Sequence, residues 1–363
     1  MRVLVVLPTA IMGGAERVIF NLTYELLAQG HSVIVYIMSR GRQPGWEILQ
    51  GNTSFELIVK DHASEKKSLI SFFYNIFLIS RKNKIDLVIS SHTHVNAVLS
   101  FFRKINILKC GFLISRESTF IFERFFGLKR FLFWILYRFF YGSQDVLVFQ
   151  TEGMKKSLES TLGFKPVHNS IVLENPVALR FIDESLASKE YISTSQMRFV
   201  ACGRLVPIKG FDRLLRVFAK TLVLYPNCIL EIIGDGPERS NLEELACSLA
   251  IKNKVIFHGR VNNPFIYYRG ANIGVVSSVK EGFPNVLIEM MACGVMSLVS
   301  TPCTDGVHAL PNVKVSECVD DDCLFKAIIS VVDARTDHSL SYRMYVESDR
   351  SISKFLERLL ESY

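Results

Sequence analysis

The sequence predicts an α/β protein made of two doubly wound, parallel-sheet domains. Short apolar runs alternate with helix-length segments along the whole chain, which is typical of strands joined by helical crossovers. The 363 residues exceed the size of one ordinary hydrophobic core. Charge also divides the chain, because residues 1–178 carry 21 Lys and Arg against 13 Asp and Glu, whereas the remainder is nearly balanced. We therefore expect a domain over 1–178 and a second over 179–341.

The first domain begins with the continuous apolar run Val3–Leu7, as expected of a parallel strand covered on both faces. Gly13-Gly14 follows, and then a helical pattern that ends before Gly30. Further strands are predicted at Val33–Met38, Phe55–Val59, Leu87–Ser90, Ile107–Ser115 and Asp145–Gln150.

The second domain repeats this alternation after a linker that we place around Asn175–Val177 and the polar segment 183–195. The last segment, 342–363, has its apolar residues on one helical face, which predicts one amphipathic helix that crosses back to the first domain. The predicted strands are Arg198–Ala201, Ile229–Ile233, Val255–His258, Ile273–Ser277 and Ser297–Ser300.

Two carboxylates eight positions apart mark the most informative motif, Glu281-Gly-Phe-Pro-Asn-Val-Leu-Ile-Glu289. It follows a predicted strand and opens a helix, so free backbone amides at its tip would attract an anion. The two acids could accept hydrogen bonds from sugar hydroxyls beside that anion, which indicates a sugar nucleotide. The simpler interpretation is one loop acid and one exposed helix acid.

Two cations, Arg204 and Lys209, lie in the loop after the first strand of the second domain. Cations fixed there would stabilise the charge of a departing diphosphate without a metal. Solvated surface charges are the alternative. Glycine turns follow neighbouring strands, at Gly203, at Gly234 and before Arg260-Val261, and plain turn chemistry would also explain them.

In their order and spacing, four motifs resemble the retaining GT-B glycosyltransferases of family 4. The resemblance covers essentially the whole chain and is strongest over 198–301. It implies two Rossmann-like domains that face each other across a cleft, with the nucleotide-sugar donor in the second and the acceptor in the first. The motifs are Gly13-Gly-Ala-Glu-Arg17, Gly203-Arg-Leu with Lys209-Gly-Phe, Ile233-Gly-Asp-Gly-Pro237, and Glu281 with Glu289.

The resemblance also implies roles for individual residues. Arg204 and Lys209 would hold the donor diphosphate, Glu281 the hydroxyls of the transferred sugar, and Glu289 the ribose. The acceptor hydroxyl would attack the face that the diphosphate leaves, with no protein base and no metal. Further donor contacts would come from Gly14, Gly203, Gly234, Arg260, Val261 and the main chain of Phe283, Pro284 and Asn285.

The chain departs from the family pattern in three places. Asp305–Ala309 lacks the acid that many relatives have after the strand following Glu289, and Ala271-Asn272 replaces a frequent Ala-Asp. Ser115-Arg116-Glu117-Ser118 stands where many relatives have a histidine. Arg116 or Glu117 would then face the transferred sugar, and we favour Arg116. The nearby His92 and His94 are alternatives that fit structural roles better.

Aromatic and basic residues are interleaved from Phe120 to Tyr141, including Arg124, Lys129, Arg130 and Trp134. Such a segment suits the headgroup boundary of an anionic membrane, beside the acceptor site. The alternative is a helix that is mostly buried against the sheet, and a partly exposed helix pair is a compromise.

Several classes of protein are disfavoured. The eight cysteines are scattered, which suggests a reduced, cytosolic protein, and Asp320-Asp321-Asp322 fits a helix start better than a metal site. The apolar runs are shorter than the ~18–20 residues that span a bilayer, and the N-terminus lacks a secretory signal. The absence of G-x-G-x-x-G disfavours a nicotinamide-dependent dehydrogenase.

We therefore expect a peripheral membrane enzyme on the cytosolic face that needs no cofactor and binds no nucleic acid. It would transfer a hexose or N-acetylhexosamine from a UDP-linked donor to an oligosaccharide or polyprenyl-lipid-linked acceptor in bacterial surface polysaccharide synthesis (O-antigen, capsule or lipopolysaccharide). A sugar-nucleotide epimerase of the same fold and a non-catalytic nucleotide-sugar or membrane-surface binding protein stay open as alternatives.

Overall fold

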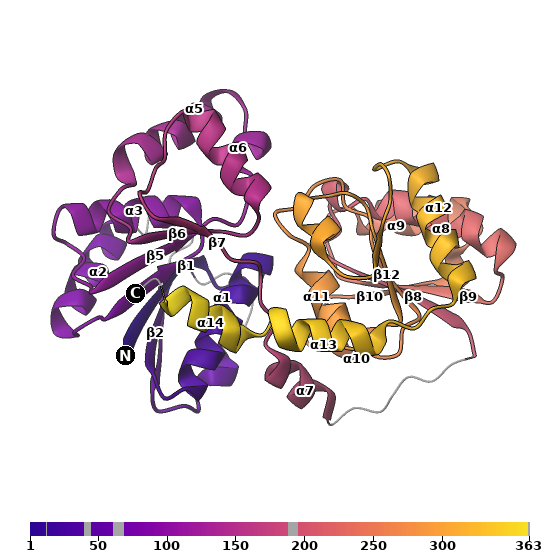
Figure 1. The fold of residues 1–363 in the computed structure, drawn as a ribbon, viewed down its shortest axis with the longest axis horizontal. Coiled ribbons are helices and arrows are strands. Elements are labelled where there is room, and N and C mark those ends of the chain that lie inside the picture. The colour runs from indigo at the N-terminus through magenta and orange to yellow at the C-terminus, as the bar shows by residue number, and fades with distance from the viewer. Residues whose placement is uncertain (12, 40–44, 61–68, 188–194, 362–363) are drawn as a thin grey trace. The chain divides into compact units, whose positions relative to one another are not determined.

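The computed structural model describes residues 1–11, 13–39, 45–60, 69–187 and 195–361 (Figure 1). The chain divides into two compact units, which we describe separately. Unit 1 contains Met1–Pro176 and Ile352–Tyr363, and unit 2 contains Val177–Ser351. Each is a parallel sheet between layers of helices, as the alternation of apolar runs and helical segments predicts.

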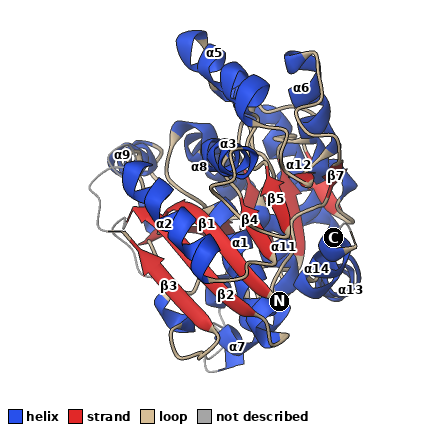
Figure 2. Cartoon of the chain, turned by 90° about the vertical axis from the view of Figure 1, so that its left-hand side faces the viewer, coloured by secondary structure: helices blue, strands red, loops and turns tan. Residues whose placement is uncertain are grey.

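Unit 1 has a seven-stranded parallel sheet in the order β3-β2-β1-β4-β5-β6-β7, and Figure 2 shows its first strands side by side. β1 lies between β2 and β4, and all of its residues from Val3 to Leu7 are fully buried, which explains its uninterrupted apolar sequence. The strands are β1 Arg2–Thr9, β2 Ser32–Ser39, β3 Phe55–Val59, β4 Leu87–Ser90, β5 Phe112–Arg116, β6 Val146–Phe149 and β7 Ser170–Val172.

Among the described residues of unit 1, two clusters of buried side chains lie between helices and sheet. One gathers around Phe72 and Leu99, and the other around Tyr137 and Leu147. The helices are α1 Gly14–Ala28, α2 Leu69–Lys82, α3 Thr93–Lys104, α4 Ile121–Arg124, α5 Gly127–Ile135, α6 Glu152–Leu162 and α14 Ile352–Leu360, with a 3₁₀ turn η1 at Glu47–Leu49 and a π-helical turn η2 at Leu136–Phe140.

Unit 2 has a six-stranded parallel sheet in the order β10-β9-β8-β11-β12-β13. β8 and β11 are neighbours in this sheet although 70 residues separate them in the chain, so the loops that follow them meet at one edge. The strands are β8 Met197–Cys202, β9 Cys228–Ile233, β10 Val255–Gly259, β11 Ile273–Val276, β12 Ser297–Ser300 and β13 Val313–Val315.

Helices on the two faces of this second sheet each bury one cluster of apolar side chains. The helices are α7 Leu179–Ala187, α8 Phe211–Leu224, α9 Arg239–Ser248, α10 Phe265–Tyr268, α11 Asn285–Ala292, α12 Asp321–Ala334 and α13 Ser339–Asp349. Three 3₁₀ turns complete the unit, η3 Pro207–Lys209, η4 Lys252–Lys254 and η5 Asp305–Ala309.

The end of the chain differs from the single helix that the apolar pattern predicts. Two helices are present, because α13 ends at Asp349 and α14 begins at Ile352. Between them Ser351 forms a parallel bridge with Val177, which requires extended backbone there. α14 packs against α1 in unit 1 (Figure 1), and Ser353 Oγ donates a hydrogen bond to Glu25 Oε1 at 2.8 Å.

Other differences from the predicted elements have local causes. β7 and β13 were not predicted, because each is a three-residue edge strand that pairs on one side only. β5 begins at Phe112 rather than at Ile107, since the preceding residues form the turn that ends α3, where Asn106 has φ 62°. Of the predicted linker, 183–187 belongs to α7, whereas 188–194 lies outside the described residues.

Candidate functional site

The strand-end glycines of unit 2 hold its loops against one another. A Cβ added to Gly234, whose φ is +138°, would lie 1.9 Å from the carbonyl oxygen of Gly203. One added to Gly210, at φ +63°, would lie 2.2 Å from that of Ser277. Only glycine tolerates such approaches. These glycines therefore pack the loops after β8, β9 and β11 into one continuous edge.

Lys209 and Glu281 meet at this edge. The Lys209 ammonium forms an ion pair with Glu281 Oε1, and the side chains are 26% and 13% exposed. Ser278 Oγ donates a hydrogen bond to the same carboxylate oxygen at 2.6 Å. Ser277 Oγ donates to the Lys209 carbonyl at 3.0 Å, so both loops are fixed to each other by side chain and main chain. A cation and an acid from motifs 72 residues apart are thus brought together, half-buried and accessible.

The loop between Glu281 and α11 presents backbone donors. Within the described part of the chain, no acceptor is recorded for the N–H groups of Gly282 and Phe283. Thr304 Oγ1 donates to the Gly282 carbonyl at 3.2 Å, and the Glu281 N–H donates to the Cys303 carbonyl at 2.9 Å, so the loop is held from one side by the residues after β12. Amides fixed next to a lysine form a site that suits an anion.

The second acid of the motif, Glu289, is half-buried in the second turn of α11. Burial raises the pKa of the Tyr268 hydroxyl well above its usual range, and the side chains of Cys202 and Glu289 add to this increase. The alternative interpretation, in which Glu289 is an exposed helix acid, is wrong because the residue is half-buried.

The other predicted donor residues of unit 2 surround this edge with varied exposure. Arg204 is exposed, and its side chain forms no ion pair with any residue in the described part of the chain. Arg260 is exposed and Val261 half-buried after β10. Pro284 is the N-cap of α11 and Asn285 its first residue. The roles assigned to these residues stay predictions.

An arginine that the sequence did not single out braces the same edge. Arg213 of α8 donates from Nη1 to the Ser277 carbonyl at 3.0 Å, and its Nε lies 3.6 Å from Asp321 Oδ1. Asp321 also pairs with Arg216 at 2.6 Å. Asp320 caps α12 by accepting from the Cys323 N–H at 2.7 Å, so the acidic triplet begins a helix, as predicted. The use of Asp321 as a brace could not be inferred from that pattern.

Arg116 lies in unit 1 and is almost entirely buried, at 3% exposure. Its guanidinium donates to Ser91 Oγ at 3.1 Å and to Asn175 Oδ1. Burial lowers the pKa of Arg116 to about 10, and the adjacent carboxylate of Glu117 counteracts this. The guanidinium is therefore held by protein groups, and its contact with a transferred sugar stays a prediction.

Glu117 is also buried and accepts three hydrogen bonds from side chains. The donors are Thr93 at 2.6 Å, Tyr141 at 2.5 Å and Asn96 at 3.2 Å. Burial raises the pKa of Glu117, and these hydrogen bonds oppose the change. This polar cluster joins α3 to the segment after η2, and its density of donors was not apparent from the sequence.

The glycines after β1 begin α1. Gly13 is the N-cap, and its N–H donates to Glu16 Oε2 at 3.2 Å, while Gly14 is the first helical residue and is exposed. The other oxygen of Glu16 lies 3.1 Å from His92 Nε2. Burial lowers the pKa of the nearby His94 to about 4. Both histidines thus have structural surroundings.

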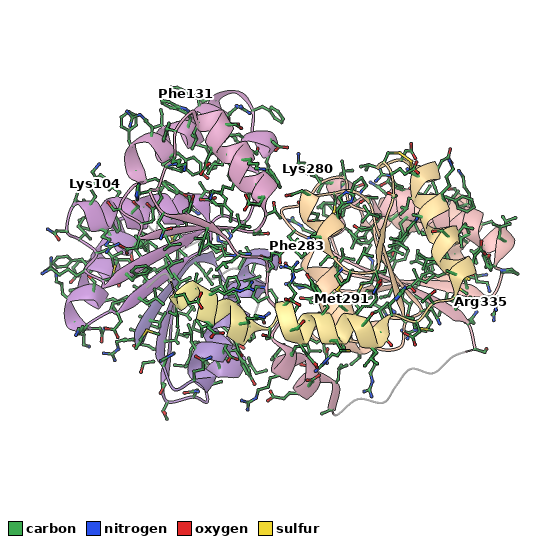
Figure 3. All side chains as sticks on the ribbon, in the orientation of Figure 1. Lys104, Phe131, Lys280, Phe283, Met291 and Arg335 are labelled. Atoms are coloured by element: carbon green, nitrogen blue, oxygen red, sulfur yellow. A yellow bond between two sulfur atoms is a disulfide. The ribbon has the colours of Figure 1, made fainter. Side chains whose placement is uncertain are left out.

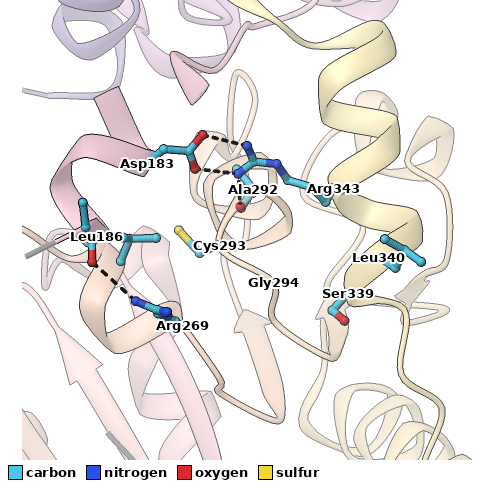
Figure 4. Close-up of a pocket in the computed structure, with 10 residues that line it drawn as sticks. Asp183, Leu186, Arg269, Ala292, Cys293, Gly294, Ser339, Leu340 and Arg343 are labelled. Atoms are coloured by element: carbon cyan, nitrogen blue, oxygen red, sulfur yellow. Dashed lines mark hydrogen bonds and ion pairs between the residues drawn. The ribbon is translucent and has the colours of Figure 1, made fainter. Parts of the chain in front are cut away.

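A cavity of about 520 Å³ lies at the opposite end of α11, where Figure 4 shows Arg343 bridging to Asp183 and to the Ala292 carbonyl. Cys293 and Gly294, which follow α11, also line it. None of the predicted donor residues lines this cavity, so it is distinct from the loop edge that begins α11.

The cysteines differ in one respect from the prediction of a fully reduced protein. Cys318 and Cys323 form a disulfide across the start of α12, with their Cα atoms 5.7 Å apart. The two residues are brought together because Asp320 between them caps the helix. The other six cysteines are free.

Comparisons with known proteins agree with this architecture. Residues 12–180 match the model of Glycosyltransferase Family 4, and residues 183–315 match that of Glycosyl transferases group 1. An uncharacterized glycosyltransferase of Methanocaldococcus jannaschii is 30% identical over 75% of this chain and 71% of its own length.

Two further proteins are similar to this chain. A Campylobacter jejuni enzyme, N-acetylgalactosamine-N,N'-diacetylbacillosaminyl-diphospho-undecaprenol 4-alpha-N-acetylgalactosaminyltransferase, is 30% identical over 46% of this chain and 42% of its own. The crystal structure of Anabaena HepE in complex with UDP superposes with a TM-score of 0.79 at 14% identity, covering 100% of this chain and 99% of that one. Together with the two family models, these relationships show that the chain belongs to the family 4 glycosyltransferases and has the GT-B fold.

Proposed function

We propose that the protein is a retaining glycosyltransferase that moves a hexose or N-acetylhexosamine from a UDP-linked donor to a lipid-linked or oligosaccharide acceptor in surface polysaccharide synthesis. The observation that carries this proposal is the meeting of Lys209, Glu281 and Ser278 beside the amides of Gly282 and Phe283. One small edge of unit 2 thereby offers a cation, an acid and backbone donors.

Each of these groups suits one part of a nucleotide sugar. Lys209, Arg204 and the loop amides would hold the diphosphate and stabilise the negative charge that it gains as it leaves. Glu281 would accept hydrogen bonds from sugar hydroxyls, and Glu289 from the ribose. The acceptor hydroxyl would attack the face from which the diphosphate departs and pass its proton to a phosphate oxygen, so no protein base and no metal are needed.

The choice of donor and acceptor draws on the similar proteins. HepE has been crystallised with UDP, which favours a uridine nucleotide. The Campylobacter enzyme is named for an acceptor linked to diphospho-undecaprenol, which favours a polyprenyl-linked acceptor. Such a lipid resides in a membrane, so the protein would work at a membrane surface on the cytosolic side.

Unit 1 has a surface with the composition that such a location requires. α5 contains no buried residue and stands out from the unit (Figures 1 and 2). We call the following set the apolar α5–η2 surface: Phe126, Leu128, Phe131, Leu132 and Phe139, which are between 51% and 75% exposed. Figure 3 shows Phe131 at the outer side of α5.

Cations accompany these apolar side chains. Lys129 and Arg130 are exposed on the same helix, and Arg138 lies over the Phe139 ring at 5.8 Å. Apolar side chains that enter the headgroup region beside cations that face anionic lipid are typical of peripheral binding. No helix in the described ranges is both long and apolar enough to cross a bilayer.

A donor screen tests the enzymatic part of the proposal. Purified protein is incubated with UDP- and GDP-sugars and with polyprenyl-diphosphate-linked acceptors, with and without chelator. Sugar transfer that survives chelation is the expected result. Interconversion of donor sugars without transfer would indicate an epimerase, and donor binding with no turnover would indicate a non-catalytic binding protein.

Vesicle sedimentation tests the membrane part. Wild-type protein should sediment with vesicles that contain anionic lipid, and Phe131→Glu should reduce the bound fraction. Val223→Glu is the matched control, because Val223 is 82% exposed on α8 in unit 2. Equal binding of wild type and Phe131→Glu would refute the assignment of the apolar α5–η2 surface.

A further inference from the structure

A buried arginine, Arg350, contacts the loop between Glu281 and α11, residues 282–284, which we call the donor loop. It follows α13 and is 1% exposed, which is unusual for an arginine. Its guanidinium carbon lies 5.5 Å from the ring centroid of Phe283 and 5.5 Å from that of Tyr345. Its Nε donates a hydrogen bond to the Tyr345 hydroxyl at 2.7 Å. The planar cation is therefore held against two aromatic rings and aligned by a hydrogen bond.

One of those rings belongs to the loop that carries the predicted donor contacts. Phe283 is 7% exposed and immediately precedes Pro284 and α11 (Figure 3). The main chain of the two preceding residues, Glu281 and Gly282, is fixed by hydrogen bonds to Cys303 and Thr304. The loop is thus held both by hydrogen bonds to the residues after β12 and by contact with the Arg350 guanidinium.

The backbone of Arg350 has a second attachment. The Val177 N–H donates to the Arg350 carbonyl at 2.7 Å, and Val177 pairs with Ser351 in a parallel bridge. The chain passes between the two units at 176–177 and again at 351–352. Arg350 is therefore joined by its backbone to both crossings and by its side chain to the donor loop.

We propose that Arg350 is a positioning residue, which holds Phe283 so that the amides of the donor loop keep the arrangement that binds the donor diphosphate. This inference rests on the proposed function. A cation against the face of an aromatic ring is attractive, and the attraction is stronger where water is excluded, as it is here. Loss of the cation frees Phe283 to change rotamer, which displaces the backbone of Gly282 and Phe283 and weakens binding at a site that Arg350 does not itself touch.

A purely structural role predicts a different outcome. If Arg350 only fills the core, its replacement lowers the stability of the protein. Any effect of that replacement on UDP affinity should then add to the effect of a second core substitution. A residue that acts through Phe283 instead shows coupling, because once either partner is gone the other can no longer hold the loop. Coupling in UDP affinity therefore separates the two roles.

The experiment is a double-mutant cycle on the full chain, with UDP as the ligand and calorimetry as the measurement. The variants are Arg350→Met, Phe283→Leu and the double variant, each checked by thermal unfolding. The matched control cycle pairs Arg350→Met with Phe265→Leu, since Phe265 is 3% exposed in the same core cluster as Phe283. Arg350→Lys tests whether a cation of another shape restores the contact.

We expect Arg350→Met and Phe283→Leu each to weaken UDP binding about tenfold, the scale of a desolvated cation–π contact, and the double variant to be no weaker than either single variant. Arg350→Lys should recover most of the affinity, and the Phe265 control cycle should be additive. If Arg350→Met does not fold, Tyr345→Phe takes its place in the cycle with Phe283→Leu, because it removes the hydroxyl that aligns the guanidinium. The same criterion then applies.

Additive effects on UDP affinity, or an unchanged affinity in Arg350→Met, would overturn the positioning role and leave the proposed function intact. A wild-type protein that binds neither UDP nor a UDP-sugar would overturn the proposed function, and this inference with it.

Discussion

Replacement of Lys209 by methionine tests the proposed donor site most sharply, because methionine keeps most of the length of the side chain and removes the ammonium group. Lys209 forms an ion pair with Glu281. Removal of one positioned charged group that stabilises a developing anion lowers kcat by ~10²–10³-fold. We therefore expect Lys209→Met to lower the transfer rate by at least ~10²-fold and to weaken UDP binding.

For Glu281, the partner of Lys209, we predict the opposite effect on UDP binding. With side chains 26% and 13% exposed, the pair lies between a surface pair and a buried pair, so its coupling should amount to about 1–2 kcal/mol. UDP has no transferred sugar for Glu281 to bind, so in that complex the carboxylate only competes for Lys209. Glu281→Gln should thus tighten UDP binding about tenfold and yet lower transfer at least ~10²-fold.

The assay measures both UDP affinity by calorimetry and the rate of sugar transfer for each variant. Lys220→Met is the control, because Lys220 of α8 forms an exposed ion pair with Asp322 of α12. Weaker UDP binding in Glu281→Gln, or a near-normal transfer rate in Lys209→Met, would refute the assignment of this pair to the donor site.

Three further predictions concern stability and covalent state. Burial, with a contribution from the neighbouring His92, lowers the pKa of His94 to about 4 from an ordinary value of 6.5. As the pH decreases, the unfolded chain therefore binds a proton at this histidine before the folded protein does. The free energy of unfolding should consequently fall by up to ~3 kcal/mol between pH 6.5 and pH 4. Urea unfolding of His94→Gln should lack this fall, and an identical pH profile would contradict the burial argument. Thiol titration of the denatured, unreduced protein should find six thiols, because Cys318 and Cys323 are bonded, and a count of eight would refute the disulfide. Gly234→Ala should lower the free energy of unfolding, measured in urea, by more than ~1 kcal/mol, because the added Cβ would lie 1.9 Å from a carbonyl oxygen. The control Gly51→Ala should leave this free energy unchanged, since no atom lies within 4 Å of its added Cβ. Equal stabilities of the two variants would show that the loops do not pack as described.

The sequence allowed the two-sheet architecture to be predicted because buried parallel strands are continuous apolar runs. Val3–Leu7 and Ile273–Val276 are examples that need no tertiary information. The edge strands β7 and β13 were missed because a strand of three residues that pairs on one side only does not need a continuous apolar run. Local pattern thus predicts the centre of each sheet better than its edges.

The sequence pointed to candidate residues for the site, but it could not predict the contacts between them. Glu281 and Lys209 could be recognised separately, but their pairing depends on β8 lying next to β11, which is a property of the sheet order. Arg350 gave no signal at all, because an arginine after an amphipathic helix usually faces solvent. Only the packing of α13 against the donor loop shows that it is buried on Phe283.

The stereochemistry of transfer tests the central claim most directly. The measurement is the anomeric configuration of the first product formed by wild-type protein from an α-linked UDP-sugar, determined by nuclear magnetic resonance in the presence of chelator. The account predicts an α-linked product in which the sugar is attached to the acceptor, with UDP released. A β-linked product would contradict same-face attack assisted by the leaving diphosphate, and the absence of product with every donor and lipid-linked acceptor would contradict the proposed function itself.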